Sequence, residues 1–340
     1  MHSSNLPRIN AGAIVPERAV GVSLGERLTT WWKRLWLKAP ADQDLAATDE
    51  FATLSSLSLN PGHTKLKVGV VSVRGNHRKH NEDNYFVPGR LPIRAELSDS
   101  DPNVPSMTLE SRNLFVVADG MGGQQAGEKA SLMAVELIPR AVSKRLHQEE
   151  KEPRQVQDAI REAVAEVNSE IIGSAGLVTE YANMGTTVVL AQFCKDKVYV
   201  TGIGDSRAYR LRDGHLEKLT KDHTLADALF EAGTITEDEL PHHKFKNVLY
   251  LYLGSKDART GPEDFRVLDV KTGDRFIMAS DGLTGVVSDD AIKEILAMVA
   301  DPQEAAITLK DLALENDSKD NITCLVIHVV PENVPVGVGT

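Results

Sequence analysis

The chain has few cysteines and no long apolar run. Its 340 residues include two cysteines, Cys194 and Cys324, and both lie in apolar runs typical of strands. We therefore expect two buried core thiols and no disulfide framework. No apolar run is long enough to span a bilayer, and the first residues do not form a signal-peptide pattern. These absences favour a cytoplasmic protein.

Basic residues are too few to balance the acidic ones. Lys and Arg number 38 against 49 Asp and Glu, so the formal net charge is −11 at pH 7. Without a basic stripe to offset phosphate repulsion, a general nucleic-acid binder is excluded. An acidic protein can still handle a phosphate group when metal ions reverse the local potential. With 41% apolar residues, the chain can fill a sizeable core in one large domain or two small ones.

All three tryptophans fall in one segment near the N-terminus, at 23–38. Ser23 and Glu26 form a capping-box start for a helix there. We interpret this helix as an amphipathic arm for a membrane surface or a groove on a partner protein. Packing on its own domain is the alternative, but the polar stretch at 42–60 would tether an external arm. The apolar face consists of Leu24, Leu28, Trp31, Trp32, Leu35 and Trp36.

Regular folded structure begins after residue 62. We expect an N-terminal extension over 1–62, a catalytic domain over 63–331 and a short tail over 332–340. Strands mostly follow strands and helices arrive in pairs, which indicates an α+β domain with antiparallel sheets. The expected strands cover 65–73, 83–87, 114–118, 185–190, 198–203, 208–211, 266–270, 275–279 and 322–330. The expected helices cover 125–147, 153–173, 225–232, 289–299 and 302–314, with a loop at 88–112 and a hairpin turn at 213–214.

Acidic residues stand at the ends of several expected strands. Asp119 ends the apolar run at 114–118 and opens a glycine-rich turn, Asp-Gly-Met-Gly-Gly, before a helix. Similar sites follow at Asp205, Asp281 and Asp320. Rigid strand ends can aim such side chains, and glycines allow the backbone to approach a small charged ligand closely. Oxygen ligands of this kind suit Mg²⁺ or Mn²⁺ better than zinc.

Convergence of these carboxylates would require cations. Two carboxylates about 4 Å apart repel by roughly 4 kcal/mol at an effective dielectric constant near 20. Upstream, Arg78 precedes a further acidic pair, Glu82 and Asp83. If the acids lie apart instead, each Asp-Gly pair is an ordinary turn.

Three other kinds of phosphate site fail on the sequence itself. A Walker loop needs Gly-Lys-Ser/Thr, which does not follow 120–123. A dinucleotide fingerprint needs a third glycine where Gln125 stands. A cysteine-dependent phosphatase needs an exposed thiol in an anion-binding loop, whereas both cysteines lie in strand-like runs.

The ordered series of motifs resembles the metal-dependent Ser/Thr protein phosphatases, the PPM or protein phosphatase type 2C family, in their bacterial form. The resemblance covers about 65–330, and although any one motif is weak, the ordered series is highly specific. The matching segments are Gly-x-x-Arg-x-x-Asn-Glu-Asp at 75–83, Val-Ala-Asp-Gly-Met-Gly-Gly at 117–123, Gly-Thr-Thr at 185–187, Gly-Asp-Ser-Arg at 204–207, Asp-His at 222–223, Glu-Ala-Gly at 231–233, Asn-Val-Leu at 247–249, Ser-Asp-Gly-Leu at 280–283 and Asp-Asn-Ile-Thr at 320–323.

This resemblance implies an αββα sandwich, in which two antiparallel sheets lie face to face, helix pairs flank them and metal ions sit at one end of the cleft. It implies that Asp119 bridges two Mn²⁺ or Mg²⁺ ions and that the carbonyl of Gly120 binds one of them. Asp281 and Asp320 would then complete the shell of the other ion.

The remaining acids have implied roles as well. Glu82 and Asp83 would bind ions or orient their waters, and Asp205 with Asp281 would hold the third ion found in many relatives. Arg78 would grip the substrate phosphate through its planar fork. A water that bridges two ions would attack phosphorus without a covalent intermediate. The implied substrates are proteins phosphorylated on serine or threonine, and the implied partner is an opposing Ser/Thr kinase.

Several positions depart from the family pattern. Met121 stands where many relatives have a His that protonates the leaving group; bacterial members commonly share this Met, so we expect a metal-bound water to donate the proton. In the flap at 240–254, Lys246 replaces a usual Arg and Tyr-Leu-Tyr at 250–252 replaces Thr-Arg-Ala, which makes substrate choice the least transferable property. Val73 also stands at a position that is often acidic. Four histidines have the spacing of exposed loop residues rather than of a zinc site: His77, His80, His242 and His243.

We therefore predict a cytoplasmic phosphoprotein phosphatase that the arm at 23–38 brings to a partner or to a membrane surface. One alternative is a catalytically silent relative that binds phosphoproteins and signals through its fold and arm. A second is a regulatory module in which the arm does the main work and phosphatase activity is auxiliary. The joint presence of Asp119, Asp281, Asp320 and Arg78 favours the enzyme.

Overall fold

The chain divides into two compact units, Met1–Ala46 and Ala47–Thr340. All residues that the computed structural model describes belong to the second unit, namely 50–60, 64–88, 113–122, 126–146 and 152–331. The predicted arm at 23–38, most of the predicted loop at 88–112 and the tail at 332–340 lie outside the described residues.

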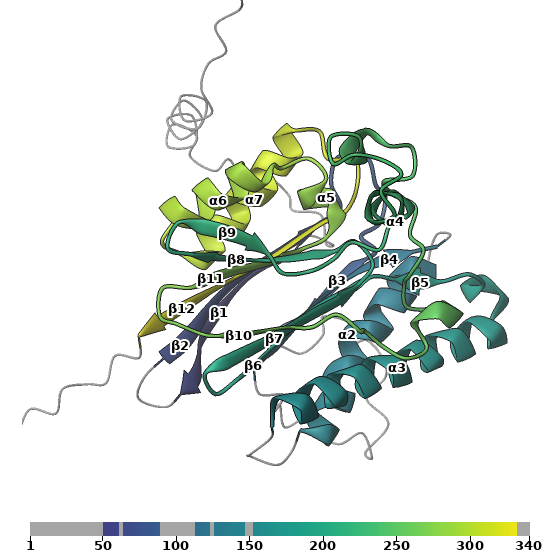
Figure 1. Cartoon of the computed structure of the whole chain (residues 1–340), viewed down its shortest axis with the longest axis horizontal. Helices are drawn as coiled ribbons and strands as arrows, with labels where there is room; N and C mark the ends of the chain where they lie inside the picture. Colours follow the sequence, from purple (N-terminus) through teal and green to yellow (C-terminus); the bar gives the residue numbers. More distant parts are fainter. Residues whose placement is uncertain (1–49, 61–63, 89–112, 123–125, 147–151, 332–340) are drawn as a thin grey trace, which may run out of the picture. The chain divides into compact units, whose positions relative to one another are not determined.

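Two antiparallel sheets face each other in the second unit, with helices on their outer sides (Figure 1). In spatial order, the first sheet consists of β1 (Glu50–Asn60), β2 (Thr64–Val73), β12 (Ile322–Pro331), β11 (Arg275–Ala279), β8 (Arg207–Arg212) and β9 (His215–Lys218). The second consists of β10 (Arg266–Asp269), β7 (Lys197–Ile203), β6 (Val188–Cys194), β4 (Leu114–Met121) and β3 (Asp83–Phe86), with β5 (Gly185–Thr186) paired to the end of β4.

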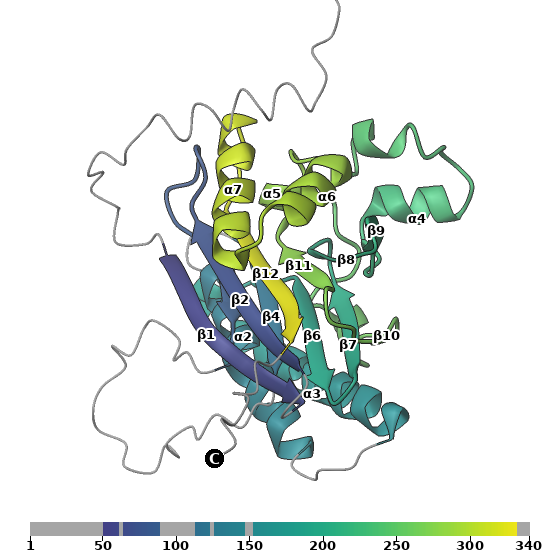
Figure 2. The ribbon, with the colours of Figure 1, turned by 90° about the vertical axis from the view of Figure 1, so that its left-hand side faces the viewer.

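The helices form the outer layers. The long pair α2 and α3 lies against the second sheet, and α6 and α7 lie against the first (Figures 1 and 2). α7 begins where Asp301 accepts hydrogen bonds from two backbone amides and a proline follows, which is a favourable N-terminus. The described helices are α2 (Ala126–Arg145), α3 (Pro153–Leu177), α4 (Leu225–Glu231), α5 (Asp281–Thr284), α6 (Asp289–Met298) and α7 (Pro302–Glu315), with short 3₁₀ turns at Thr179–Tyr181, Leu240–His242 and Lys256–Ala258. The α+β prediction and the αββα sandwich are confirmed.

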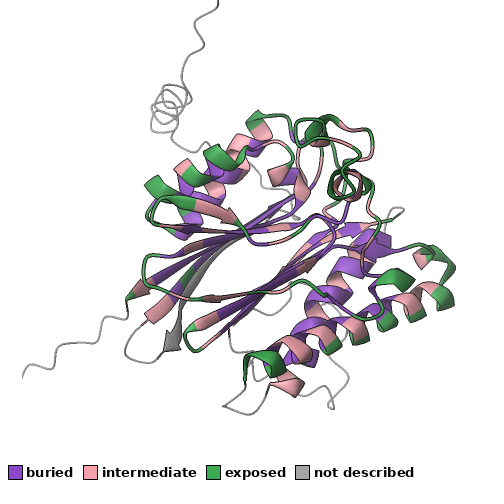
Figure 3. Cartoon of the chain, in the orientation of Figure 1, coloured by how far each residue is buried: buried purple, intermediate pink, exposed green. Residues whose placement is uncertain are grey.

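The apolar side chains fill two layers of core because the central strands are covered on both faces. In β4, Phe115 and Val117 point between the sheets, whereas the alternate residues Leu114 and Val116 pack under α2 and α3. Between the sheets, Phe193 lies edge-on to Phe115, with ring centroids 5.7 Å apart. Burial on both sides explains why this strand reads as an unbroken apolar run, and Figure 3 shows the central strands as buried.

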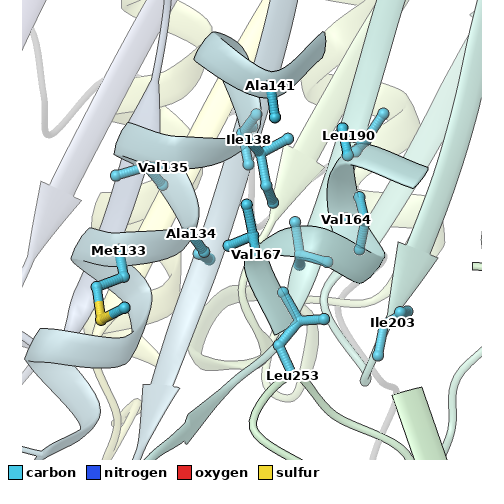
Figure 4. Close-up of a cluster of buried hydrophobic side chains, with 14 of the residues drawn as sticks. Met133, Ala134, Val135, Ile138, Ala141, Val164, Val167, Leu190, Ile203 and Leu253 are labelled. Carbon is cyan, nitrogen blue, oxygen red and sulfur yellow. The ribbon is translucent and has the colours of Figure 1, made fainter. Parts of the chain in front are cut away.

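The second layer of core joins the helix pair to its sheet. Ile138 of α2 and Val164 and Val167 of α3 lie against Leu190 of β6 and Ile203 of β7, all with almost no exposed surface (Figure 4). Burying one such side chain stabilises a fold by about 1.5–3 kcal/mol. This layer therefore holds the second sheet rigidly from outside.

Strand β1 corrects the predicted N-terminal boundary. It lies within 42–60, which the sequence indicated to be a polar tether, and it pairs along its length with β2. The compact unit accordingly begins at Ala47 and not at 63. The strand itself contains apolar residues among its serines and threonine, and only the longer stretch at 42–60 is polar on average.

Two smaller predictions also need correction. β4 continues to Met121, so Asp119 and Gly120 lie within a strand and do not open a turn. Cys194 ends β6 and is only partly buried, whereas Cys324 is fully buried as expected. The hairpin turn at Asp213-Gly214 is present between β8 and β9, and both of its residues have positive φ.

Candidate metal centre

Five aspartates lie at one edge of the two sheets. Asp83 begins β3 and pairs directly with Asp119 near the end of β4. Asp205 follows β7, Asp281 follows β11 as the first residue of α5, and Asp320 precedes β12. Because neighbouring strands are antiparallel, the end of one strand and the beginning of the next meet at the same edge. The fold thus gathers acids from positions far apart in the chain.

Burial, together with the charges of neighbouring acids, raises the pKa values of four of these aspartates. Burial raises the pKa of Asp83 to about 7, and the charges of Asp281 and Asp320 add to the shift. Burial and then Asp281 raise the pKa of Asp205 to about 7. The pKa of Asp281 rises to about 6, again by burial first and then by Asp320. Asp119, which faces all four other aspartates, has its pKa raised well above the usual range. A nearby cation would relieve this repulsion.

Two carboxylate oxygens in this cluster have no hydrogen-bond partner among the described residues. They are the Oδ1 atoms of Asp83 and Asp281, and both are buried. A buried polar atom without a partner costs about 1–3 kcal/mol. Unpaired carboxylate oxygens are the ligands that hard divalent cations prefer, so the residues fit Mg²⁺ or Mn²⁺.

The cluster is nevertheless not a closed cage. Within the described ranges, no three His, Cys, Asp or Glu side chains converge as ready ligands of one ion. Arg78 supplies positive charge instead, since its Nη2 lies 2.7 Å from Oδ2 of Asp320 and its Nη1 lies 3.8 Å from Oε2 of Glu82. The carboxylates are therefore gathered, and their charge is balanced in part by Arg78, the residue to which the family resemblance gives the role of binding the substrate phosphate.

The loop that carries Arg78 is fixed at its two ends. Gly75 has φ +69°, and a Cβ there would lie 2.0 Å from the carbonyl oxygen of Asp320, so only glycine fits this approach. At the other end, the Gly120 amide donates to the Glu82 carbonyl at 3.2 Å. The predicted ligands Glu82 and Gly120 are thus in direct main-chain contact.

Two residues of the site were not singled out by sequence reasoning. Asn321 is 2% exposed; its Oδ1 accepts from the Glu82 amide at 2.9 Å, and its Nδ2 donates to the carbonyls of Arg74 and His80 at 3.0 and 2.9 Å. Ser280 donates its hydroxyl to Oδ2 of Asp83 at 2.7 Å. The signal for both was their place directly beside a predicted acid, Asp320 or Asp281.

The flap lies beside this edge of the second sheet. His223 is buried, and its Nδ1 contacts the backbone of Gly204 while its carbonyl accepts from the Tyr250 amide at 3.0 Å. Val248 and Tyr250 present apolar surface to solvent, and Lys246 is exposed. Of the four loop histidines, three are exposed and His243 is half-buried, in agreement with the prediction of surface residues.

Comparison with known proteins agrees with this architecture. The model of the protein phosphatase 2C family matches residues 94–315. Serine/threonine phosphatase stp of Listeria monocytogenes is 34% identical over 258 residues, which cover 75% of this chain and 92% of that protein. The structure of the catalytic domain of the phosphatase PstP in complex with two manganese ions is 31% identical, with a TM-score of 0.61 over 78% of this chain and 99% of that chain. Stp1 from Staphylococcus aureus gives 29% identity and a TM-score of 0.65 over 77% and 94% of the two chains.

The family model spans more than half of the sequence, and the relatives align over most of their own length. The sandwich and the order of the motifs agree with the same family. The chain therefore belongs to the protein phosphatase 2C family.

Proposed function

We propose that this chain is a divalent-cation-dependent phosphoprotein phosphatase that hydrolyses phosphoserine and phosphothreonine. The observation that carries the proposal is the cluster of five aspartates at one sheet edge, in which Asp83, Asp119, Asp205 and Asp281 have raised pKa values and two buried carboxylate oxygens have no hydrogen-bond partner among the described residues. An arginine beside them supplies a fork for a phosphate group. The solved relative PstP, which holds two manganese ions, supports the same reading.

The chain's own residues divide into ion ligands and a phosphate ligand. Asp119, the Gly120 carbonyl, Asp281 and Asp320 would hold two Mn²⁺ or Mg²⁺ ions, and Asp205 with Asp281 would hold a third. When bound, such ions lower the pKa of water and offset the negative charge of a phosphoryl group. Glu82 and Asp83 would bind ions or orient their waters.

Arg78 would exchange partners during the reaction cycle. In the structure its guanidinium balances Asp320 and Glu82. Ions on those carboxylates would supply the same charge, which leaves the guanidinium free to bind the phosphate of the substrate. Asn321 would keep the loop of Arg78 and Glu82 in place while this exchange occurs.

The arm at 23–38 would bring the enzyme to its targets. Its tryptophan-rich face suits a membrane surface or a partner groove, and the expected setting is the cytoplasm, opposite a Ser/Thr kinase. No helix in the described part of the chain is long and apolar enough to cross a bilayer. Because β1 pairs with β2, a deletion that tests the arm should end at residue 46 and spare 50–60. Unchanged localisation and partners after this deletion would contradict recruitment.

The activity is tested with the full-length protein, para-nitrophenyl phosphate and a set of phosphopeptides. We expect Mn²⁺-stimulated release of phosphate, with phosphoserine and phosphothreonine peptides preferred over a phosphotyrosine peptide. Asp281→Asn is the matched inactive variant. A folded protein that releases no phosphate at any Mn²⁺ concentration would favour the silent relative instead.

A further inference from the structure

Thr187 lies between the two acid-bearing strand ends of the second sheet. It occupies the break between β5 and β6, and the register of the sheet sets it opposite Asp119 on β4 and opposite Gly204, after β7, on the other side. It is 2% exposed.

The sheet ladder is irregular at this position. The Thr187 amide donates to the Asp119 carbonyl at 2.8 Å, as expected for an antiparallel pair that exchanges two bonds. In a regular ladder the Asp119 amide would donate to the Thr187 carbonyl in return. Here it donates to Oγ1 of the Thr187 side chain, at 3.0 Å. The Thr187 carbonyl accepts from the Thr186 hydroxyl at 2.9 Å instead. A side-chain hydroxyl has therefore replaced a backbone acceptor at the residue whose carboxylate lies at the centre of the cluster.

The same side chain holds the turn of Asp205. Its Oγ1 lies 2.7 Å from Oγ of Ser206, which is also 2% exposed. Its methyl group packs on Gly204, which has φ +102°, and a Cβ at Gly204 would lie 2.6 Å from that methyl carbon. Thr187 thus contacts the residues on both sides of Asp205, one through its hydroxyl and one through its methyl group.

We propose that Thr187, with Ser206, is a positioning residue that sets the separation of the Asp119 and Asp205 carboxylates and thereby the affinity of the site for divalent cations. The inference rests on the proposed metal-dependent function. A hydroxyl that bonds the backbone at Asp119 and the side chain of Ser206 fixes both acid-bearing segments relative to one central strand. Groups that orient metal ligands in this way typically change metal affinity or activity by 10–100-fold when they are removed.

The two parts of the threonine side chain can be tested separately. Thr187→Val keeps the methyl group on Gly204 and removes the hydroxyl, whereas Thr187→Ser keeps the hydroxyl. We expect Thr187→Val to bind Mn²⁺ about 10-fold more weakly in isothermal titration calorimetry. Thr187→Ser should restore most of the affinity, and Ser206→Ala should weaken it.

Thr201→Val is the matched control. Thr201 lies on β7, is also 2% exposed, and donates its hydroxyl to the carbonyl of Asp264, which is not one of the five clustered aspartates. We expect this variant to lower the urea midpoint of the metal-free protein while leaving Mn²⁺ affinity unchanged. An affinity loss in Thr187→Val that Thr201→Val does not share supports positioning rather than general destabilisation.

The outcomes separate the inference from the proposed function. If the wild-type protein binds no Mn²⁺, the metal-dependent function fails. If the wild type binds Mn²⁺ and both Thr187→Val and Ser206→Ala bind it equally well, the positioning role is overturned. If Thr187→Val does not fold, Ser206→Ala decides alone, since it leaves the acceptor of the Asp119 amide intact.

Discussion

Truncation of Asn321 to alanine tests how the Arg78 loop is held. The side-chain amide of Asn321 makes three hydrogen bonds to this loop. The bond that its Oδ1 accepts from the backbone N–H of Glu82 is buried. Leaving a buried donor unsatisfied costs about 1–3 kcal/mol. The two lost carbonyl partners belong to the less buried residues Arg74 and His80, where water can substitute, so each adds less. We expect Asn321→Ala to lower the free energy of unfolding by about 2–4 kcal/mol.

Urea unfolding of the metal-free protein measures the stability. Steady-state kinetics with para-nitrophenyl phosphate at saturating Mn²⁺ measure KM and kcat, which report on the geometry of the site. Displacement of Arg78 should raise KM more than it lowers kcat, because in the proposed function this loop would bind the phosphate group of the substrate. Asn316→Ala is the control, since Asn316 also donates its side-chain amide to a carbonyl, that of Val286, which is not part of the loop. An unchanged urea midpoint together with an unchanged KM in Asn321→Ala would refute the reasoning.

Four further predictions follow from the structure. Asp281→Asn should lose most Mn²⁺ binding and turnover while the protein stays folded; normal activity at modest Mn²⁺ would contradict its assignment. Arg78→Ala should weaken phosphate inhibition, measured with inorganic phosphate, and unchanged inhibition would remove its role. Burial, with the charge of Arg275, lowers the pKa of His328 from 6.5 in the unfolded chain to about 4 in the folded protein. The folded protein therefore loses up to about 3 kcal/mol of stability as the pH falls from 6.5 to 4, because the unfolded chain binds the proton more readily. His328→Gln should remove this pH dependence, so the difference in unfolding free energy between wild type and this variant should shrink as the pH falls, and an unchanged difference would contradict the shift. Cys324→Ser should cost about 1–3 kcal/mol in urea unfolding without changing kcat, and inactivation of a stable variant would contradict this.

Much of the fold could be predicted because its signals are local. The central strands are covered on both faces, so runs such as 114–118 and 322–330 are continuously apolar and easy to recognise. The outer helices are amphipathic and carry ordinary start signals, as at Asp301 and Pro302. β1 escaped prediction because it depends on pairing with β2, a contact that the local sequence does not encode.

The acids of the site could be predicted as a set, but not their arrangement. Asp119, Asp205, Asp281 and Asp320 each stand beside a glycine or at a strand end, which a sequence pattern can reveal. The pairing of Arg78 with Asp320 joins residues 242 positions apart and follows only from the tertiary fold. The hydrogen bond from the Asp119 amide to the Thr187 hydroxyl could not be predicted either, because the sequence does not distinguish this threonine from any other threonine in a strand.

The clustered aspartates come from both layers of the sandwich. Asp83, Asp119 and Asp205 adjoin strands of one sheet, whereas Asp281 and Asp320 adjoin strands of the other. A divalent ion held by both groups would act as a cross-link, and a ligand present at 100 times its dissociation constant adds about 2.7 kcal/mol to the stability of the folded state. Scarcity of the ion would then shorten the lifetime of the molecule against proteolysis as well as silence it, so that the abundance of this chain would follow the supply of the metal.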